Sequence, residues 1–372
     1  MGQLQLVEGD FDAFFSVPFR CYGPASPFVS LMRSDLERSL NSTRNPLFAR
    51  FGTVTYFTAH RNGLPVGRIV AHIHHESNRR HDLRRGYFGF FDCADDREAA
   101  GLLLHAAESW VGERGCDEIA GNFNLTAMQQ IGVVTEGFEH PPYTDMHYNP
   151  PHIPRLLEAC GYLRSFPMRT WETIVPRTDP EPLLGPAQRA ALQDQDIRWA
   201  RVRRRGFRDT LEHIRLLLNE SFAKNPMFVP LTPEEFSFHT QEMMWIVDPR
   251  ITQLAYRGEE LVGVVVCIPD LNPFLRSTRS RLGLTTPWHY FRFRLRRRRA
   301  VILFLGVKPA LANAGLGGAM LYRLTGDLRS AGYTHVGGTW IADANPPSLK
   351  QVERFGLRPL HRLHLFGKAL TT

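Results

Sequence analysis

The sequence predicts an α/β or α+β fold that is built twice along the chain. The first observation is an internal repeat: Ala59–Gly67 (AHRNGLPVG) recurs as Ala255–Gly263 (AYRGEELVG), at an offset of 196 residues. The second is that Asn149–Pro151 recurs as Asn345–Pro347, at the same offset of 196 residues. The third is that short apolar strand patterns alternate with helical patterns in both copies. Two landmarks that share one spacing indicate a tandem duplication.

Length and composition agree with two packed domains. The chain has 372 residues, and about 150 residues per domain is usual. Prolines at positions 176, 180, 182 and 186 interrupt any helix or strand between the two copies. We therefore expect a first domain at residues 1–175, a linker at 176–195 and a second domain at 196–372. Each domain should be a mixed central sheet flanked by helices.

In the first copy we expect a hairpin of two strands, a short apolar strand, a helix, a strand and a second helix. The Asn62-Gly63 dipeptide is the hairpin signal, because both turn residues tolerate a positive φ. The elements are expected, in order, at residues 54–60, 67–74, 87–91, 98–113, 117–122 and 153–160.

In the second copy two amphipathic helices are expected at residues 209–223 and 233–245, before the repeated hairpin. Hairpin, central strand, helix, strand, helix and closing strand then follow. These are expected at residues 253–256, 261–268, 300–307, 317–330, 334–341, 348–355 and 359–368.

Composition excludes several classes of protein. No run of 18 apolar residues occurs, so no segment is expected to span a membrane. The N-terminus carries Glu8 and Asp10 rather than a basic and apolar signal, so we expect a cytoplasmic location. Five cysteines without C-x-x-C spacing favour free thiols. His72 and His74 share a strand face but have no further ligand at a suitable spacing, so no metal is expected.

The most specific motif is a glycine-rich turn between a predicted strand and a predicted helix. It reads Ala312-Asn-Ala-Gly-Leu-Gly-Gly-Ala319. Glycines let the backbone approach a ligand, and the first helical N–H groups are free to bind an anion such as phosphate. No Gly-Lys-Ser/Thr follows, so the turn is not a Walker loop. A close-packed turn without a ligand is the alternative interpretation.

The order of hairpin, apolar strand, glycine turn, helix, strand, Asn and helix resembles the GNAT superfamily of CoA-dependent acyltransferases. Its Gln/Arg-x-x-Gly-x-Gly/Ala turn falls on Ala312–Gly317. The resemblance implies that this turn binds the CoA pyrophosphate, that Leu303–Val307 diverges from its neighbour to hold pantetheine, and that Asn345 contacts the cofactor. The implied cofactor-binding residues are Leu305, Val307, Asn313, Gly315, Gly317, Gly318 and Asn345.

The resemblance covers both halves and extends to bacterial tandem-GNAT proteins, some of which are linked to N-acylation of sphingoid bases as bacterial ceramide synthases. Gly121-Asn122-Phe123-Asn124 and Trp340-Ile341 belong to the pattern that is shared with this group. It implies acyl-CoA, or an acyl carrier protein, as the donor and an amine lipid as the acceptor.

Three positions depart from the family pattern. Ala312 replaces the usual Gln or Arg, so one phosphate contact is missing. Val352 stands where many relatives have a Tyr that protonates the leaving thiolate. The first copy has Asp95–Glu98 in place of the glycine turn, and its carboxylates would repel pyrophosphate. We therefore expect the second domain to bind CoA and the first to have lost it.

Residues 270–300 form a basic and aromatic insertion between the second hairpin and the central strand. Residues 274–300 contain nine arginines and no acid; the chain's formal charge is +8, so the remainder carries 8 − 9 = −1. This composition is typical of segments that bind anionic membrane surfaces. A solvated loop and a nucleic-acid contact are the alternatives. Membrane or substrate contacts are expected at Trp288, Phe291, Arg296, Arg297, Arg298 and Arg299.

An amine must be neutral to attack a thioester, so a general base is expected. The predicted central strand, residues 301–307, has no carboxylate. The catalytic candidates are Asp343 at a strand end, and Tyr148 and Glu136 in the loop at residues 135–151. Further candidates are Asp145, His147 and His239.

Two functions of different class follow. The first is an acyl-CoA-dependent N-acyltransferase that acts on an amine. The favoured acceptor is a long-chain sphingoid base, which would give a ceramide-type amide at the inner surface of the membrane. The second is a non-catalytic protein with degraded GNAT sites that binds membranes or nucleic acid. A soluble N-acetyltransferase for a small polar amine is a narrower alternative to the first.

Overall fold

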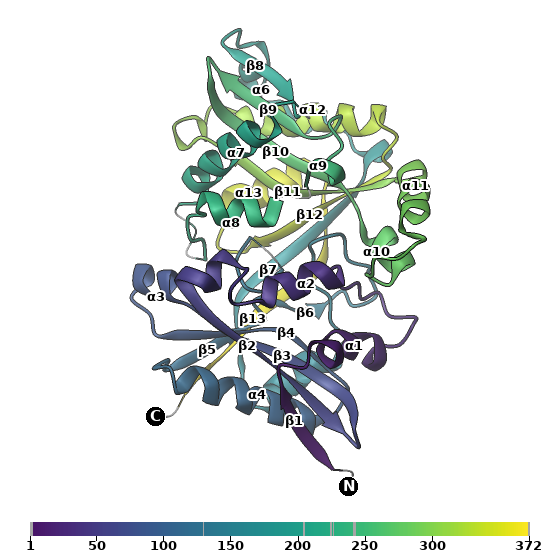
Figure 1. Ribbon diagram of the computed structural model, residues 1–372. Coiled ribbons are helices and arrows are strands. Elements are labelled where there is room, and N and C mark those ends of the chain that lie inside the picture. Colours follow the sequence, from purple (N-terminus) through teal and green to yellow (C-terminus); the bar gives the residue numbers. More distant parts are fainter. Residues whose placement is uncertain are drawn as a thin grey trace.

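The structure is a computed structural model that describes residues 3–128, 130–203, 205–223, 225, 227–240 and 243–370. Its strands form one mixed thirteen-stranded sheet that runs through the whole molecule, with helices packed on both faces (Figure 1). The strand order is β1-β2-β3-β4-β5-β13-β7-β12-β11-β10-β9-β8, and β6 pairs with β13. The predicted α/β class is confirmed.

The first half contains every element that the sequence predicted there. The Asn62-Gly63 turn has φ of 53° and 76°, as the predicted hairpin requires. Closing strand β7 and the N-terminal elements before β2 were not predicted. The elements are β1 (Leu4–Glu8), α1 (Phe11–Cys21), α2 (Arg33–Leu40), β2 (Gly52–Arg61), β3 (Leu64–His74), α3 (His75–His81), β4 (Arg85–Cys93), α4 (Arg97–Gly112), β5 (Glu118–Gly121), β6 (Val133–Glu136), α5 (His152–Ala159) and β7 (Leu163–Ile174).

The second half follows a proline-rich segment that contains a short helix, α6 (Pro186–Gln193), beginning at a proline as helices often do. The helix expected at residues 233–245 is present as α8 and α9, and residues 241 and 242 lie outside the described residues. The remaining elements are β8 (Ile197–Arg201), α7 (Phe207–Ser221), α8 (Pro233–Thr240), α9 (Met243–Ile246), β9 (Gln253–Arg257), β10 (Glu260–Pro269), α10 (Asn272–Thr278), α11 (Thr286–Arg296), β11 (Arg299–Val307), α12 (Leu316–Ser330), β12 (His335–Ala342), α13 (Pro346–Arg354) and β13 (Arg358–Ala369).

The two halves exchange their closing strands. Strand β13 of the second half pairs with β5 of the first, and β7 of the first half pairs with β12 of the second. Between them β7 and β13 are antiparallel, and the pairs Leu163–Gly367 and Trp171–Pro359 are both present. A shift of 196 residues converts the first pair into the second, so the register of this central pair agrees with a duplication.

The exchanged strands enter each other's hydrophobic core. Phe366 of β13 is fully buried with Leu103 of α4 in the core of the first half. Trp171 of β7 is buried with Leu324 of α12 in the core of the second half. Since each closing strand lies in the partner half, the two halves form one continuous sheet, and the domain division at residues 175 and 196 stays a prediction.

Candidate active site

Strands β11 and β12 are paired along only part of their length. They pair in parallel over four residue pairs, ending at Ile302 and Gly338. Beyond this point no ladder pairing joins Leu303–Val307 to Thr339–Ala342 within the described residues, and most residues of both segments are partly exposed. Leu303 is also the extra residue of a β-bulge against β10. We call these two segments the C-terminal pairing gap; it is the divergence that the sequence led us to expect.

The glycine turn lies at the end of β11 and leads into α12. Gly315 is the residue before the helix and has φ of +80°, a conformation that favours glycine. The first-turn N–H groups of a helix have no intrahelical acceptor and carry a partial positive charge. The N-terminus of α12 is therefore a suitable site for an anion beside the C-terminal pairing gap.

The glycines of the turn serve two different purposes. A Cβ on Gly315 would lie 2.5 Å from the backbone of Ala187, and one on Gly318 would lie 2.9 Å from Gln188, so both allow α6 to pack closely. A Cβ on Gly317 would instead approach Gln351 of α13 at 2.8 Å and Val307 of β11 at 3.6 Å. Gly317 thus faces the end of the C-terminal pairing gap, while the other two explain the close packing of the turn.

The other expected cofactor residues surround the same region. Leu305 and Val307 are partly buried on β11, and Asn313 is exposed in the turn. Asn345 is exposed at the start of α13, where its side chain accepts a hydrogen bond from the Ser348 N–H (3.3 Å). An exposed amide at a helix start is open to a ligand, but its present role is that of a helix cap.

The corresponding gap in the first half is filled by the chain itself. Strand β4 pairs with β5 over only three residue pairs. The following segment then closes the gap: the Phe123 N–H donates to the Phe88 carbonyl (2.7 Å), and the Asn124 carboxamide oxygen accepts from the Phe90 N–H (2.7 Å). Every residue of Gly86–Cys93 is buried. This N-terminal pairing gap has no room for a cofactor arm.

The anion position of the first half is also occupied by the protein. Asp96 precedes α4, and one of its carboxylate oxygens accepts hydrogen bonds from the N–H groups of Glu98 and Ala99, both at 3.1 Å. Its oxygens also bind the Arg61 guanidinium at 2.7 and 2.9 Å. The carboxylate occupies the place that a phosphate takes at a helix N-terminus, which gives a structural reason for the expected loss of CoA binding.

Comparisons with known proteins agree with this geometry. Residues 214–357 match the acetyltransferase (GNAT) family. Protein YghO of Escherichia coli K12 is 26% identical over 98% of this chain and 94% of the relative. A protein of Caulobacter vibrioides named bacterial ceramide synthase is 24% identical over 96% and 94% of the two chains. A solved tandem GNAT protein from the clavulanic acid biosynthesis pathway has a TM-score of 0.59 at 12% identity, covering 100% of this chain and 99% of that one.

This chain has a tandem GNAT fold. The family model and the ceramide synthase relative together make it an N-acyltransferase, as the sequence predicted. The C-terminal pairing gap and the turn before α12 both lie inside the matched residues, 214–357.

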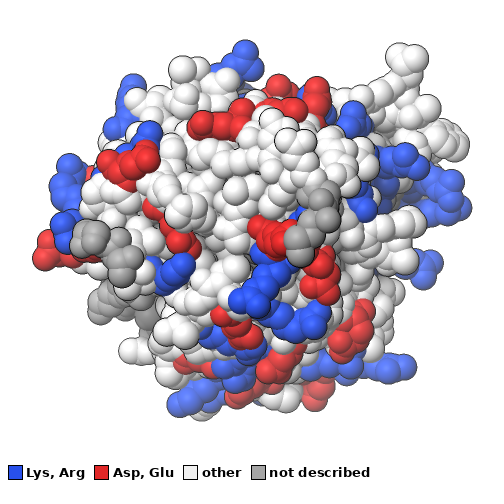
Figure 2. Space-filling view, turned by 90° about the horizontal axis from the view of Figure 1, so that it is seen from below, with Lys and Arg blue, Asp and Glu red and all other residues white. Residues whose placement is uncertain are grey.

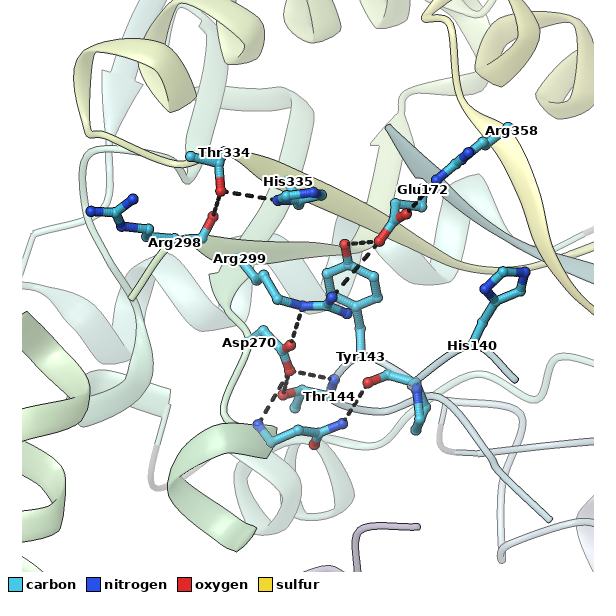
Figure 3. Close-up of polar contacts among 12 residues, drawn as sticks. His140, Tyr143, Thr144, Glu172, Asp270, Arg298, Arg299, Thr334, His335 and Arg358 are labelled. Atoms are coloured by element: carbon cyan, nitrogen blue, oxygen red, sulfur yellow. Dashed lines mark hydrogen bonds and ion pairs between the residues drawn. The ribbon is translucent and has the colours of Figure 1, made fainter. Parts of the chain in front are cut away.

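The loop after β6 reaches across from the N-terminal GNAT half to the C-terminal one (Figure 3). The Tyr143 hydroxyl donates to Glu172 (2.6 Å), and the Arg299 guanidinium lies 3.8 Å from the centre of the Tyr143 ring. Arg299 also pairs with Asp270 (3.0 Å), whose carboxylate accepts from the Thr144 hydroxyl (3.0 Å). Buried charges of this kind are costly to leave unpaired, so the network fixes the loop beside β11.

Asp145 lies in this loop and is the candidate whose surroundings best suit a general base. It is partly buried, and no hydrogen bond or ion pair is found for its carboxylate within the described chain. Burial raises its pKa to about 7. The next residue, Met146, packs in the same hydrophobic cluster as Val301 and the diverging residues Leu303 and Phe304. A carboxyl group that titrates near neutral pH is suited to accept a proton from an ammonium group.

The three favoured catalytic candidates have other surroundings. Asp343 pairs with Arg362 (2.7 Å) and Arg169 (3.5 Å), so its carboxylate already binds two guanidinium groups. The Tyr148 hydroxyl is buried and donates to the Phe138 carbonyl (3.1 Å). Glu136 is exposed at the end of β6. These contacts favour structural roles for Asp343 and Tyr148, and none of the three has been shown to be catalytic.

The histidine candidates are buried and neutral near pH 7. Burial lowers the pKa of His147 and of His239 to about 4. It does the same for His72 and His74, the pair that suggested a metal. Within the described residues no group of three or more His, Cys, Asp or Glu side chains is placed to hold a metal ion.

The basic insertion folds into two helices, α10 and α11, at the side of the molecule (Figure 1). Phe293 of α11 packs against Phe274 of α10, with ring centres 6.1 Å apart. Basic side chains gather at the corresponding edge in Figure 2. On its outer side α11 and the preceding loop expose Leu284 (102%), Trp288 (63%), Phe291 (55%) and Leu295 (71%). Within the described ranges no helix is long and apolar enough to cross a bilayer.

The arginines at the end of α11 do not act as one group. Arg296 and Arg298 are exposed. Arg297 instead pairs with buried Asp248 (3.0 Å), and Arg299 with buried Asp270. The prediction of four surface contacts is therefore wrong for Arg297 and Arg299, because a run of arginines in the sequence does not show that carboxylates from distant segments pair with two of them.

Proposed function

We propose that this N-acyltransferase binds acyl-CoA at the C-terminal pairing gap and transfers the acyl group to the primary amine of a long-chain, sphingoid-type lipid. The observation that carries the proposal is the contrast between the two gaps. In the C-terminal half β11 and β12 diverge beside a free helix N-terminus. In the N-terminal half the equivalent places hold Phe123, Asn124 and the Asp96 carboxylate.

The residues present suit a CoA ester. The first-turn amides of α12 can bind the pyrophosphate, with Gly317 leaving space at the end of β11. The Thr339 hydroxyl donates to the Leu303 carbonyl at the start of the gap (3.1 Å). Beyond it, Phe304–Gly306 has no ladder pairing with β12 within the described residues, so its backbone groups offer hydrogen bonds to the amide groups of pantetheine. Ala312 contributes no side-chain contact to a phosphate, so the backbone of the turn would supply most of that binding.

The reaction forms a C–N bond and breaks a C–S bond. The neutral amine attacks the thioester carbonyl, and the thiolate of CoA leaves. We assign Asp145 as the group that takes a proton from the ammonium form of the acceptor, because its carboxylate is unpaired within the described residues and its pKa is near 7. Val352 cannot protonate the thiolate, so the second proton, which the nitrogen loses as the amide forms, passes through water to the thiolate or to the solvent.

The lipid nature of the acceptor is supported by two observations. One relative is named a bacterial ceramide synthase. The stripe of Leu284, Trp288, Phe291 and Leu295 is exposed on α11 and its preceding loop, next to the exposed arginines Arg292, Arg294 and Arg296. Aromatic and aliphatic side chains flanked by arginines are typical of helices that lie in the interface of an anionic membrane. We therefore propose that α11 docks the enzyme on the inner surface of the membrane.

The alternative of a non-catalytic GNAT protein rests on Ala312 and Val352, which lack side chains that many relatives use. Incubating the pure protein with acyl-CoAs from C2 to C18 and with sphingoid bases, alkyl amines and small polar amines, followed by mass spectrometry, separates the possibilities. We expect amide formation with long-chain donors and long-chain amines. Turnover restricted to acetyl-CoA and a small polar amine would instead show a soluble acetyltransferase. No turnover in any combination would support the non-catalytic protein.

A further inference from the structure

A small, mostly apolar pocket lies between the two halves, with Ser77 of α3 and Glu235 of α8 among its lining residues. Tyr87, Phe123 and Met128 line it from the first half. Met227, Phe228 and Leu231 line it from the second half. The enclosed space is about 20 Å³, roughly the volume of a single methylene or water, so a longer group must displace side chains to enter.

Apolar side chains link the pocket to both strands of the C-terminal pairing gap. On the β11 side, the ring of Phe304 lies 6.4 Å from that of Phe222, which lies 5.8 Å from Phe228 in the pocket. On the β12 side, Trp340 and Met227 pack against the hydrophobic cluster that contains Tyr87 and Phe123. Packed apolar side chains thus connect the gap with the pocket, and an acyl chain must displace them to pass.

The pocket wall offers little to a charged or polar ligand. His74 and Glu235 line it as the residues that could carry a charge near neutral pH. Burial lowers the pKa of His74 to about 4, so its ring is neutral at pH 7, and one ring nitrogen accepts the Ser77 N–H (3.2 Å). The Glu235 carboxylate accepts the Thr232 N–H (2.9 Å). Both groups are engaged within their own segments, and the rest of the wall is mostly aromatic and aliphatic.

The flexibility of the wall permits expansion. Met128 and Met227 have unbranched side chains that adapt to irregular spaces at low cost. Phe123 is the residue that closes the N-terminal pairing gap, and its ring lies 4.8 Å from that of Tyr87. Each half therefore supplies an aromatic side chain and one adaptable methionine to the wall, Met128 from the first half and Met227 from the second.

Resting on the proposed function, we propose that this pocket receives the distal part of the acyl chain of the donor. The chain extends from the thioester in the C-terminal pairing gap, past Phe304 and Trp340, and enters between Met128 and Met227. The pocket then sets the acyl length that the enzyme uses. Each methylene that is prevented from entering lowers kcat/KM about fourfold, which corresponds to about 0.8 kcal/mol for burial of one CH₂.

The test compares one variant that narrows the pocket with one that enlarges it. Ala127→Phe adds a ring to its wall, and Met227→Ala enlarges it; Ala49→Phe, at an exposed position of the first half, is the matched control. kcat/KM is measured for acyl-CoAs from C4 to C18 with one fixed acceptor. We expect Ala127→Phe to lower it at least tenfold for C16 and less than twofold for C4. Met227→Ala should shift the optimum to longer chains, and Ala49→Phe should change nothing.

A second series fixes the donor and varies the chain length of the amine. If the variants change only the acceptor profile, the pocket holds the acceptor tail and the proposal is wrong. An unchanged donor profile in both folded variants also overturns it. Failure of the proposed function looks different, because the wild-type protein would then transfer none of the C4 to C18 acyl groups to a long-chain amine. Thermal melting checks that each variant is folded. If Ala127→Phe does not fold, the donor profile of Met227→Ala still decides the test.

Discussion

The two halves share one fold and differ at the place where a cofactor would bind. In the N-terminal half Phe88 and Phe90 on β4 are hydrogen-bonded to Phe123 and Asn124. In the C-terminal half the Thr339 hydroxyl bonds to the Leu303 carbonyl, but no segment among the described residues pairs with Phe304–Val307 on the β12 side, and most of its residues are partly exposed. The residues that follow β5, Phe123 and Asn124, therefore close the N-terminal pairing gap to a ligand.

The same contrast holds at the helix that follows each gap. Helix α4 begins with Asp96, whose carboxylate accepts two of its N–H groups, whereas α12 begins after Gly315, which has no side chain to offer. The filled half still contributes to the site. Its loop brings Tyr143 and Thr144 into contact with Arg299 and Asp270 of the C-terminal half, and its closing strand β7 lies beside β12. The exchanged strands thus fix the position of the filled half relative to the C-terminal half.

From the contrast between the two gaps, we expect the largest loss of CoA affinity on substitution of Gly317. A glutamate there places a negative charge beside the pyrophosphate site, and two charges about 4 Å apart at an effective dielectric of about 20 repel by about 4 kcal/mol. Gly317→Glu should therefore weaken CoA binding roughly 1000-fold, measured by calorimetry. Gly326→Glu, on the same helix with no neighbour within 4 Å of a new Cβ, is the control. Normal CoA binding by Gly317→Glu would move the cofactor away from this turn.

The next effect concerns Asp145. Asp145→Asn should lower kcat about 10²–10⁴-fold, the usual contribution of a general base. In the wild type the rate should rise with pH through about 7, since the carboxylate must be ionised and burial raises its pKa to about 7. The variant should lose that step. Glu136→Gln and Asp343→Asn test the other candidates, and a larger loss from either would assign the base to that residue.

The same pKa has a consequence for stability with a defined sign. Because the folded-state pKa of Asp145 is above the ordinary value for Asp, the folded protein binds the proton more tightly than the unfolded chain. This contribution to the free energy of unfolding is complete below about pH 4 and is lost as the pH rises through about 7. Asp145→Asn should be the more stable protein above pH 7 in denaturant titrations, and equal stability there would show that the carboxyl group is well solvated.

Much of this architecture was predictable from the sequence. The Asn62-Gly63 turn and the spacing of Leu103, Leu104 and Ala107 are local signals, and both gave the observed elements. The glycine turn was located correctly between β11 and α12 because strand, glycines and helix follow one another directly.

The remaining features depend on partners that are distant in sequence. Nothing local shows that β13 pairs with β5, or that Arg299 pairs with Asp270, because each contact joins segments that only the folded sheet brings together. Asp145 was a minor candidate since burial, which raises its pKa, cannot be read from a Pro- and Tyr-rich loop. The resemblance to tandem GNAT proteins was what linked the turn to CoA.

A moderate effect is expected on the outer face of α11, which has no counterpart in the N-terminal half. Replacing Arg292, Arg294 and Arg296 with Ser should weaken binding to vesicles containing anionic lipid by about 3 kcal/mol, or roughly 100-fold, at about 1 kcal/mol per arginine. Arg297 and Arg299 are kept because they pair with buried carboxylates.

Co-sedimentation with vesicles measures this effect, and CoA affinity should not change. The wild type should also dissociate in salt, because the Debye length falls to about 3 Å at 1 M. Removing three exposed arginines from the first half (Arg44, Arg50 and Arg80) gives the same change in net charge at another place. Equal binding by the two triple variants would mean that membrane attraction depends on net charge and not on α11.

The smallest effect tests the filled anion position of the N-terminal half. Asp96→Ala removes the cap of α4 and its bonds to Arg61, so the free energy of unfolding should fall by about 1–2 kcal/mol. CoA affinity, measured by calorimetry below the melting temperature, should stay within twofold of the wild type, because Asp96 and the α12 turn belong to different halves. Asp96→Asn, which keeps a capping oxygen, should recover most of the stability. If Asp96→Ala instead reduced CoA affinity as strongly as Gly317→Glu, the N-terminal half would be contributing to cofactor binding, and the contrast between a filled and an available gap would no longer explain the division of roles.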